Sequence, residues 1–508
     1  MFIRNDYLAA KFFVYCKKKT LSVIKKLAGQ TAIYGLSTIV GRFINYLLVP
    51  IQTRVFNQAQ FGIISGLFAY ITFLNVLLTH GMETAFFRFA EKRNHENAVY
   101  STSLKSVGIL SILFASLVFL FSEQISDITE MGAKAIYIQL VAAIIALDAI
   151  SSIPFALLRR QNKALRFAII KNAGIAINIL LNLYFLLLCP YWFENHGTLL
   201  PFYENPLDIG VIFFANLASS LLSFLLLIPQ MREISLSSEK ALYKEMLAYA
   251  LPMMLVGFAG MINETIDRIL IIYLIPDKEL ALRMNGIYSA NYKLSIIITL
   301  FIQAFKYSAE PFFFSHSKNS NKRTVYADVM NIFILVCLGI FLMVTLNIHL
   351  FDSFIGKDFR EGIHIVPILL WANIFLGMYY NISIWYKITD QTGKGANISV
   401  IGAIITIVMN FILIPILGYM GSAIATLICY LSMMIIGYKM GQKYYPIPYD
   451  ISKFFKYSII SLVIYFAGIQ LQSRVESEIL YYTIGFSSLL LFGLIGYYNE
   501  KKTIQNLS

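Results

Sequence analysis

Seven ionisable side chains lie well inside long apolar stretches of this sequence. A charged group at such a depth in a bilayer is costly unless it faces water, a partner of opposite charge or a polar ligand. Three of the seven are cations far from the ends of their stretches, and cations in a confined polar space bind phosphate groups strongly. The seven residues are Arg42, Asp148, Lys171, Glu264, Asp267, Arg268 and Lys293.

The rise of an α-helix places several of these charges at one height. At about 1.5 Å per residue, Arg42 lies about 20 Å from the inner edge of its stretch and Lys293 about 10 Å from the outer edge. Glu264 and Arg268 lie at that level or slightly higher. The three stretches that carry them therefore predict one polar cavity in the outer half of the membrane, lined by the cations Arg42, Arg268 and Lys293.

Structural interpretations compete with binding at most of these positions. Glu264 and Arg268 are four residues apart and can neutralise each other along one helix face. Asp148 can pair with Lys171 of the next stretch, and Lys171 is close enough to the inner edge to reach the headgroups. Arg54, just beyond the first stretch, either caps the outer mouth of the cavity or anchors the helix at the interface.

Polar neighbours of the cations suggest where a sugar and a coupling ion would bind. Amide and hydroxyl side chains suit a hydroxyl-rich ligand, although hydrogen bonding between helices is an alternative role for them. An uncompensated Asp267, or Glu264, is a candidate site for Na⁺ or H⁺, as is Asp148; no other cofactor is expected. The candidate sugar ligands are Asn45, Asn263, Tyr288 and Asn291.

The composition predicts an α-helical protein of the membrane. Of 508 residues, 58% are hydrophobic and 14% are charged, and the mean hydropathy is +0.68. Apolar runs of roughly 18 to 25 residues, each long enough to cross about 30 Å of hydrocarbon, recur throughout. We expect fourteen spans, at 29–51, 60–80, 104–122, 134–157, 167–189, 208–229, 246–275, 286–305, 326–348, 363–386, 396–417, 420–438, 454–471 and 478–498.

The positions of lysine and arginine support this number and set the orientation. With the N-terminus inside, the cytoplasmic segments hold 30 Lys and Arg residues and the outer loops hold 7, when those at span ends are counted with the adjoining loop. Cytoplasmic loops carry this excess in membrane proteins. The net charge of +13 therefore encodes topology, and nucleic acid is not an expected partner. Both termini are predicted to be cytoplasmic.

The chain also contains weak signs of an internal duplication. An offset of 228 residues relates Gly174 and Asn182 to Gly402 and Asn410, and an offset of 224 relates Phe61-Gly62-Ile63 to Asn285-Gly286-Ile287. Two six-helix bundles of the same orientation are predicted, as in transporters built from parallel repeats. The expected parts are a basic interfacial segment 1–28, a bundle 29–229, a linker 230–245, a bundle 246–441, two further helices 453–498 and a tail 499–508.

Other chemistry is not supported by the sequence. The four cysteines, Cys16, Cys189, Cys337 and Cys429, are far apart and form no metal-binding spacing. The N-terminal apolar stretch is short and is followed by three lysines, which differs from a cleavable signal. No Walker A pattern is present, so direct use of ATP is not expected.

Several short motifs, in order, resemble the bacterial polysaccharide and O-antigen-repeat flippases. Pro50 and Phe61-Gly62 flank the first hairpin, and Tyr249-Ala250-Leu251-Pro252 opens the seventh span. Gly286-Ile287-Tyr288 and Ala309-Glu310-Pro311-Phe312 surround the eighth. The chain is thus similar to the multidrug/oligosaccharidyl-lipid/polysaccharide exporter superfamily over nearly its whole length.

The resemblance implies a V-shaped pair of bundles in a bacterial inner membrane. The expected activity is to move an isoprenoid-pyrophosphate-linked oligosaccharide outward by alternating access, for the synthesis of O-antigen of lipopolysaccharide, capsule or exopolysaccharide. The residues expected to bind its pyrophosphate are Arg42, Arg268, Lys293 and Arg54. Membrane lipid, a polysaccharide polymerase and glycosyltransferases of the same pathway are the expected partners. A multidrug or cation antiporter of the same superfamily is the nearest alternative, followed by a membrane polymerase or glycosyltransferase, which would need a large outer loop or an acidic pair.

Overall fold

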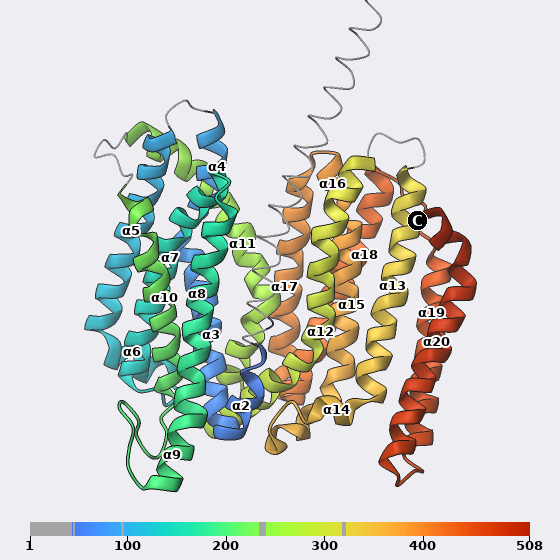
Figure 1. Ribbon diagram of the computed structural model, residues 1–508. Coiled ribbons are helices and arrows are strands. Elements are labelled where there is room, and N and C mark those ends of the chain that lie inside the picture. Colours follow the sequence, from blue (N-terminus) through green and yellow to red (C-terminus); the bar gives the residue numbers. More distant parts are fainter. Residues whose placement is uncertain (1–42, 44–45, 93–95, 233–239, 317–321, 508) are drawn as a thin grey trace, which may run out of the picture.

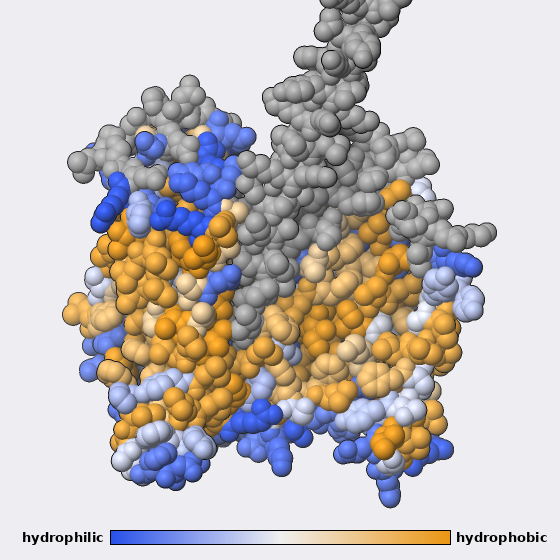
Figure 2. All heavy atoms as spheres, viewed as in Figure 1, coloured by the Kyte–Doolittle hydropathy of each residue, from blue (hydrophilic) through white to orange (hydrophobic). Residues whose placement is uncertain are grey.

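The computed structural model describes residues 43, 46–92, 96–232, 240–316 and 322–507. Within these ranges every regular element is a helix and the chain is multi-pass, since a helix satisfies its own backbone hydrogen bonds in lipid. Twelve helices in the described part of the chain are long and apolar enough to cross a membrane. Figure 2 shows an apolar surface around the middle of the molecule, with hydrophilic residues concentrated toward the two ends.

The predicted number of fourteen spans stays a prediction. The first, 29–51, lies largely outside the described residues. The eighth, 286–305, falls within helix α12 (Lys278–His316), which is long enough to span but is not among the twelve. Its Asn285, Asn291 and Lys293 lower its hydropathy, and two of these, Asn291 and Lys293, are candidate ligands predicted from the sequence.

The first part of the chain forms one group of helices (Figure 1). Helix α3 packs on α7, α7 packs on α5 and α10, and α10 packs on α8. A left-handed His80 and a positive φ at Gly81 separate α3 from α4. The elements are α2 (Val49–Val55), α3 (Gln58–Thr79), α4 (Met82–Lys92), α5 (Glu96–Leu120), α6 (Ser122–Thr129), α7 (Ala135–Arg160), α8 (Ala164–Leu183), a π-helical turn (Tyr184–Leu188), α9 (Cys189–His196) and α10 (Gly210–Met231).

The second part forms another group, and α11 lies between the two (Figure 1). Helix α11 packs on α17 and also on α3, while α12 packs on α15 and on α3. Helices α19 and α20 pack on α13 at the far side. The elements are α11 (Lys240–Leu274), α12, α13 (Lys322–Leu346), α14 (Ile348–Asp352), a 3-10 segment η2 (Lys357–Ile365), α15 (Val366–Ile382), α16 (Ile384–Ile388), α17 (Thr392–Leu417), α18 (Tyr419–Tyr444), α19 (Ile451–Gln472) and α20 (Glu478–Leu507).

Candidate functional site

A cavity of about 450 Å³ lies between the two groups of helices. Its wall combines residues of α2, α3, α8 and α10 with residues of α11 and α12, so segments far apart in the sequence enclose it. We call it the central cavity. Lining positions on α3 run from Phe61 to Thr72 and those on α12 from Ser289 to Gln303, a depth of about 15 to 20 Å at the rise of an α-helix. This size suits part of a large polar headgroup.

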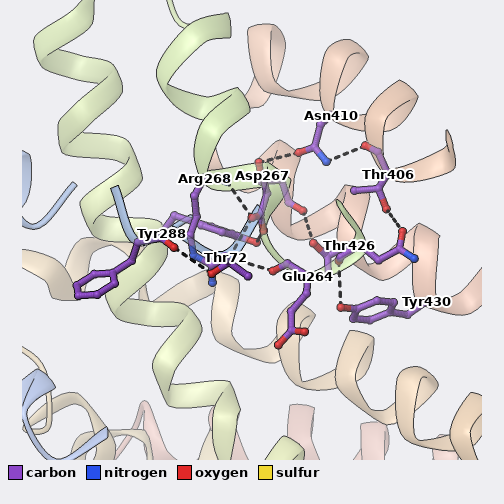
Figure 3. Close-up of polar contacts among 12 residues, drawn as sticks. Thr72, Glu264, Asp267, Arg268, Tyr288, Thr406, Asn410, Thr426 and Tyr430 are labelled. Atoms are coloured by element: carbon purple, nitrogen blue, oxygen red, sulfur yellow. Dashed lines mark hydrogen bonds and ion pairs between the residues drawn. The ribbon is translucent and has the colours of Figure 1, made fainter. Parts of the chain in front are cut away.

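Charged side chains occupy the α11 and α12 wall of the central cavity. Glu264, Arg268 and Lys293 all line it. The Lys293 ammonium and the Glu264 carboxylate make no ion pair or side-chain hydrogen bond with any residue in the described ranges, whereas Arg268 has carboxylate and aromatic partners. In Figure 3 the Glu264 carboxylate points away from the surrounding polar contacts. A half-buried ammonium without a protein partner is well suited to an anionic ligand.

Asp267 and Arg268 form a buried pair instead of two independent ligands. An Arg268 Nη1 lies 3.1 Å from Asp267 Oδ1, and the hydroxyl of Tyr288 donates to the other carboxylate oxygen. The Asp267 side chain is 5% exposed. The expectation of an uncompensated Asp267 is therefore wrong. A carboxylate in a low-dielectric site needs a counter-charge, and here Arg268 supplies it.

Arg268 remains partly available to the central cavity. Its guanidinium lies 4.6 Å from the ring centre of Tyr292 and also donates to the backbone oxygen of Glu264 at 3.0 Å. The predicted side-chain neutralisation by Glu264 is thus replaced by a bond to the backbone of that residue. The ion pair with Asp267, the contact with the Tyr292 ring and the hydrogen bond to the backbone hold the guanidinium of Arg268 in one place. It therefore lies on the same wall as Lys293.

Breaking this pair should destabilise the fold. Replacing Asp267 with alanine leaves the Arg268 charge buried without its partner, so we expect a loss of about 3 kcal/mol or more. Thermal unfolding in detergent would measure the loss as a lower melting temperature. Glu264→Gln is the matched control, because that carboxylate lacks a partner among the described residues. Equal melting temperatures for Asp267→Ala and the wild type would contradict the assignment.

Three candidate sugar ligands hold helices together and do not line the central cavity. Tyr288 donates to Asp267, and the amide nitrogen of Asn291 donates to the backbone oxygens of Ile287 and Phe359. Asn263 accepts from Thr406 of α17 at 3.1 Å, and its backbone oxygen accepts from Tyr430 of α18, also at 3.1 Å (Figure 3). We therefore do not retain them as sugar contacts.

The opposite wall carries amide side chains that were not among the candidate ligands predicted from the sequence. Asn178 donates to Asn216 at 2.9 Å, Asn182 donates to Asn178 at 2.8 Å, and Gln52 donates to Asn182 at 3.3 Å. We call these four residues the amide wall; Gln52, Asn178 and Asn216 of the four line the cavity. Asn178 and Asn182 are four residues apart on one face of α8, and this spacing is the signal that could have found them.

A close crossing of α3 and α12 closes the end of the cavity beside α2, which we call the outer end because the predicted orientation places it outside the cytoplasm. A Cβ atom on Gly62 would lie 1.9 Å from the backbone oxygen of Leu282, and one on Gly286 would lie 1.9 Å from that of Gln58. Each glycine thus faces the residue four positions before its counterpart, in keeping with the 224-residue offset. Only glycine allows two backbones to approach so closely.

Polar contacts reinforce this closure between α2, α3 and η2. Arg54 donates to the backbone oxygen of Ser353 at 2.6 Å and to that of Pro50 at 2.9 Å. Gln58 donates to the backbone oxygen of Asp358 and to Glu361, and Glu361 pairs with Arg283 at 3.0 Å. Arg54 does not line the central cavity; it ties the two groups of helices together at its outer end.

Comparison with known proteins follows from this geometry. A family model described as a polysaccharide biosynthesis protein matches residues 27–317, which is more than half of the chain. The chain belongs to the polysaccharide biosynthesis protein family. No curated protein sequence matches it.

Solved structures show that this polysaccharide biosynthesis protein has the fold of the multidrug/oligosaccharidyl-lipid/polysaccharide superfamily. The lipid II flippase MurJ in an inward closed conformation matches with a TM-score of 0.70 and 16% identity, covering 92% of this chain and 99% of that one. An inward-facing multidrug resistance MATE family transporter matches with a TM-score of 0.58 and 16% identity, over 81% and 94%. A transporter of this superfamily from Pyrococcus furiosus matches at 0.55 and 15%, over 82% and 95%.

The remaining candidate residues of this polysaccharide biosynthesis protein lie elsewhere. Arg42 and Asn45 are outside the described residues. Asp148 lies on α7 near Ser220 of α10 and Lys171 of α8, away from the residues that line the central cavity. Lys171 makes no direct ion pair within the described part of the chain, and its ammonium lies 5.5 Å from the ring centre of Phe155. The suggested Asp148–Lys171 ion pair is therefore not formed.

Proposed function

We propose that this chain is a flippase for isoprenoid-pyrophosphate-linked oligosaccharide repeat units. It moves the headgroup from the cytoplasmic to the outer leaflet by alternating access, for the synthesis of a surface polysaccharide such as O-antigen, capsule or exopolysaccharide. The observation that carries the proposal is Lys293, an ammonium that lines the central cavity and has no ion-pair or hydrogen-bond partner among the described residues. The proposed location is the inner membrane of a bacterium, with both termini in the cytoplasm.

Two cations on the α11 and α12 wall, Arg268 and Lys293, can bind a pyrophosphate. Diphosphate oxygens cannot leave water for hydrocarbon without replacement hydrogen bonds and counter-charge. Lys293 supplies three donors, and Arg268 adds a guanidinium whose own charge is already balanced by Asp267. Because Arg268 is balanced, we assign the main electrostatic attraction to Lys293.

The amide wall suits the sugars that follow the pyrophosphate. Each primary amide has two donors and an acceptor, and the bonds along the amide wall leave the Oε1 atom of Gln52 without a partner in the described part of the chain. The isoprenoid tail stays in the bilayer and passes between the two groups of helices. Glu264, which lacks a charged partner among the described residues, is the candidate coupling site for Na⁺ or H⁺; Asp148 is the more remote one.

Purified protein in liposomes tests this function directly. The lipid-linked oligosaccharide is placed in both leaflets, and an impermeant enzyme outside cleaves or modifies the accessible headgroups. We expect the protected inner fraction to become accessible only in liposomes that contain the protein. In cells, depletion should leave complete repeat units on the cytoplasmic face, whereas incomplete repeats would point to an enzyme and unchanged lipid would refute the proposal.

An exporter of organic cations is the second candidate, and one observation favours it. Glu264 offers an acidic group in a cavity that is also lined by Phe61 and Phe68, a combination that binds cations through carboxylate and ring faces. The same liposomes decide between the two. Uptake of ethidium without movement of the lipid-linked oligosaccharide would establish the exporter.

Removing one side chain of the amide wall should impair transport of the sugar headgroup without unfolding the protein. Asn216→Ala removes an acceptor from Asn178 and a group from the cavity surface, so we expect the apparent affinity for the lipid-linked oligosaccharide to fall about fivefold to tenfold, for one or two hydrogen bonds. The rate of flipping at increasing substrate density measures this. A polyprenyl pyrophosphate without sugars is the control, and equal losses for both substrates would contradict a sugar-binding role.

A further inference from the structure

A second cavity, of about 460 Å³, lies at the end of the molecule that carries α2 and α14, between α14, η2 and the connection from α19 to α20 (Figure 1). It shares no lining residue with the central cavity. We call it the outer cavity, since the predicted orientation places this end outside the cytoplasm. The residues that carry the argument are His349, Asp352, Arg360, Glu476, Glu478 and Tyr481.

The outer cavity has an ordered frame built from distant segments. Asp352 lies 3.1 Å from His349 Nδ1 and 3.5 Å from Arg360 Nη1. The His349 ring packs against Tyr481, with ring centres 4.8 Å apart. Gln472 donates to the backbone oxygens of Leu346 and Tyr481, at 2.6 and 3.1 Å. These bonds hold α14, η2 and α20 in fixed relation, so the cavity is formed before any ligand arrives.

The lining side chains that take no part in these bonds suggest that the outer cavity binds a saccharide. Glu476 and Glu478 line the cavity as exposed carboxylates and have no ion pair or hydrogen-bond partner among the described residues, so both are free to accept hydrogen bonds from a ligand. A carboxylate only accepts hydrogen bonds, and sugar hydroxyls and amino groups donate them. Tyr481 and Tyr482 add aromatic surface, which packs against the apolar face of a sugar ring. Glu478 is the first residue of α20, where a negative side chain interacts favourably with the helix dipole. This interaction explains the presence of Glu478, but it does not explain the cavity or its tyrosines.

Two other ligands fit less well. Three carboxylates against one guanidinium give the outer cavity a negative charge, which repels phosphate. Within the described ranges, no set of three or more His, Cys, Asp and Glu side chains is arranged to hold a metal ion. The ligand class that remains is a neutral or amino-substituted saccharide.

The position of the outer cavity relates it to the route out of the central cavity. Ser353 lines the outer cavity, and its backbone oxygen accepts the hydrogen bond from Arg54 of α2. Helix α2 also contributes Val49 and Gln52 to the central cavity. One short helix therefore borders the exit and touches the rim of the outer cavity.

We propose that the outer cavity binds the saccharide portion of the substrate after translocation. Binding itself follows from the residues above, whereas its place after translocation rests on the proposed flippase function. Glu476 and Glu478 accept hydrogen bonds from hydroxyl or amino groups, and Tyr481 supports a ring face. The negative charge keeps the pyrophosphate out, so the sugar and the phosphate are held at separate places during release.

Soluble disaccharides test the site on the full-length protein in detergent. The probes are chitobiose, which carries amino groups, its neutral N,N′-diacetyl form, and maltose, with inorganic pyrophosphate for comparison. Saturation-transfer NMR titrations give the dissociation constants. We expect at least one disaccharide to bind, and the double variant Glu476→Gln/Glu478→Gln to weaken that binding about tenfold through the loss of charge-assisted hydrogen bonds.

Matched variants separate this site from the central cavity. Lys293→Met should leave disaccharide binding unchanged and weaken pyrophosphate binding, and the Gln double variant should do the reverse. The Gln variants keep the side-chain shape, and an unchanged melting temperature establishes that they fold. Disaccharide binding that depends on Glu476 and Glu478 in a protein that does not flip lipid would uphold this site and refute the proposed function.

Two results would overturn the proposal. One is the absence of binding for all three disaccharides, or binding that the double variant leaves unaltered. The other is binding of Ca²⁺ that the double variant abolishes while no disaccharide binds, which would make the outer cavity a cation site.

Discussion

Lys293→Met should reduce flipping about 10- to 100-fold, because it removes a charge-assisted hydrogen bond worth about 1.5 to 3 kcal/mol from the phosphate-binding wall. Methionine keeps the length of the side chain, so the shape of the central cavity changes little. The liposome assay measures the initial rate at which inner-leaflet headgroups become accessible.

The control for this prediction is the thermal stability of the variant, which should stay the same or rise while the rate of flipping falls. Lys293 is half-buried and has no partner among the described residues, and replacing an unpaired buried charge with an apolar side chain of similar size usually stabilises a protein. Lys293→Met should therefore unfold at the wild-type temperature or above, and Lys293→Arg should retain much of the flipping. Wild-type rates for Lys293→Met would remove this residue from the mechanism.

Charge patterning in the sequence located the α11 and α12 wall well. Lys293, Arg268 and Glu264 were found because an ionisable group inside an apolar run is rare and costly, whatever the tertiary structure. The partner of Arg268 was not found. Neighbouring residues do not normally face each other on a helix, yet the guanidinium turns back to Asp267 because that carboxylate is buried against Tyr288.

The polar uncharged residues show where sequence reasoning fails. A helix in a membrane bundle is apolar nearly all round, so periodicity does not tell which face meets a cavity. Asn263 and Asn291 were candidates for the cavity surface, but they bond to α17 and to η2. Asn178 was not among the candidates, yet it bonds to Asn216 and lines the central cavity.

Adding a single methyl group at the α3 and α12 crossing should have the second large effect. Gly62→Ala would place its Cβ 1.9 Å from the backbone oxygen of Leu282, and Gly286→Ala would meet that of Gln58 at the same distance. Because backbone cannot move aside like a flexible side chain, we expect the closed outer end to lose about 3 kcal/mol, at the upper limit of overpacking costs. The population of this closed state, and with it the transport cycle, should fall about 100-fold.

Labelling of a cysteine thiol from outside the liposomes measures this loss of the closed state directly. Ser65 of α3 lines the central cavity, so Ser65→Cys should be protected from an impermeant maleimide in the wild type and labelled in either glycine variant. Cys189, Cys337 and Cys429 are buried, which keeps the background low. Gly108→Ala is the matched control, since nothing lies within 4 Å of its added Cβ. Because the crossing is nearly symmetric, Gly62→Ala and Gly286→Ala should have equal effects; full protection of Ser65→Cys in both would mean that the outer end closes elsewhere.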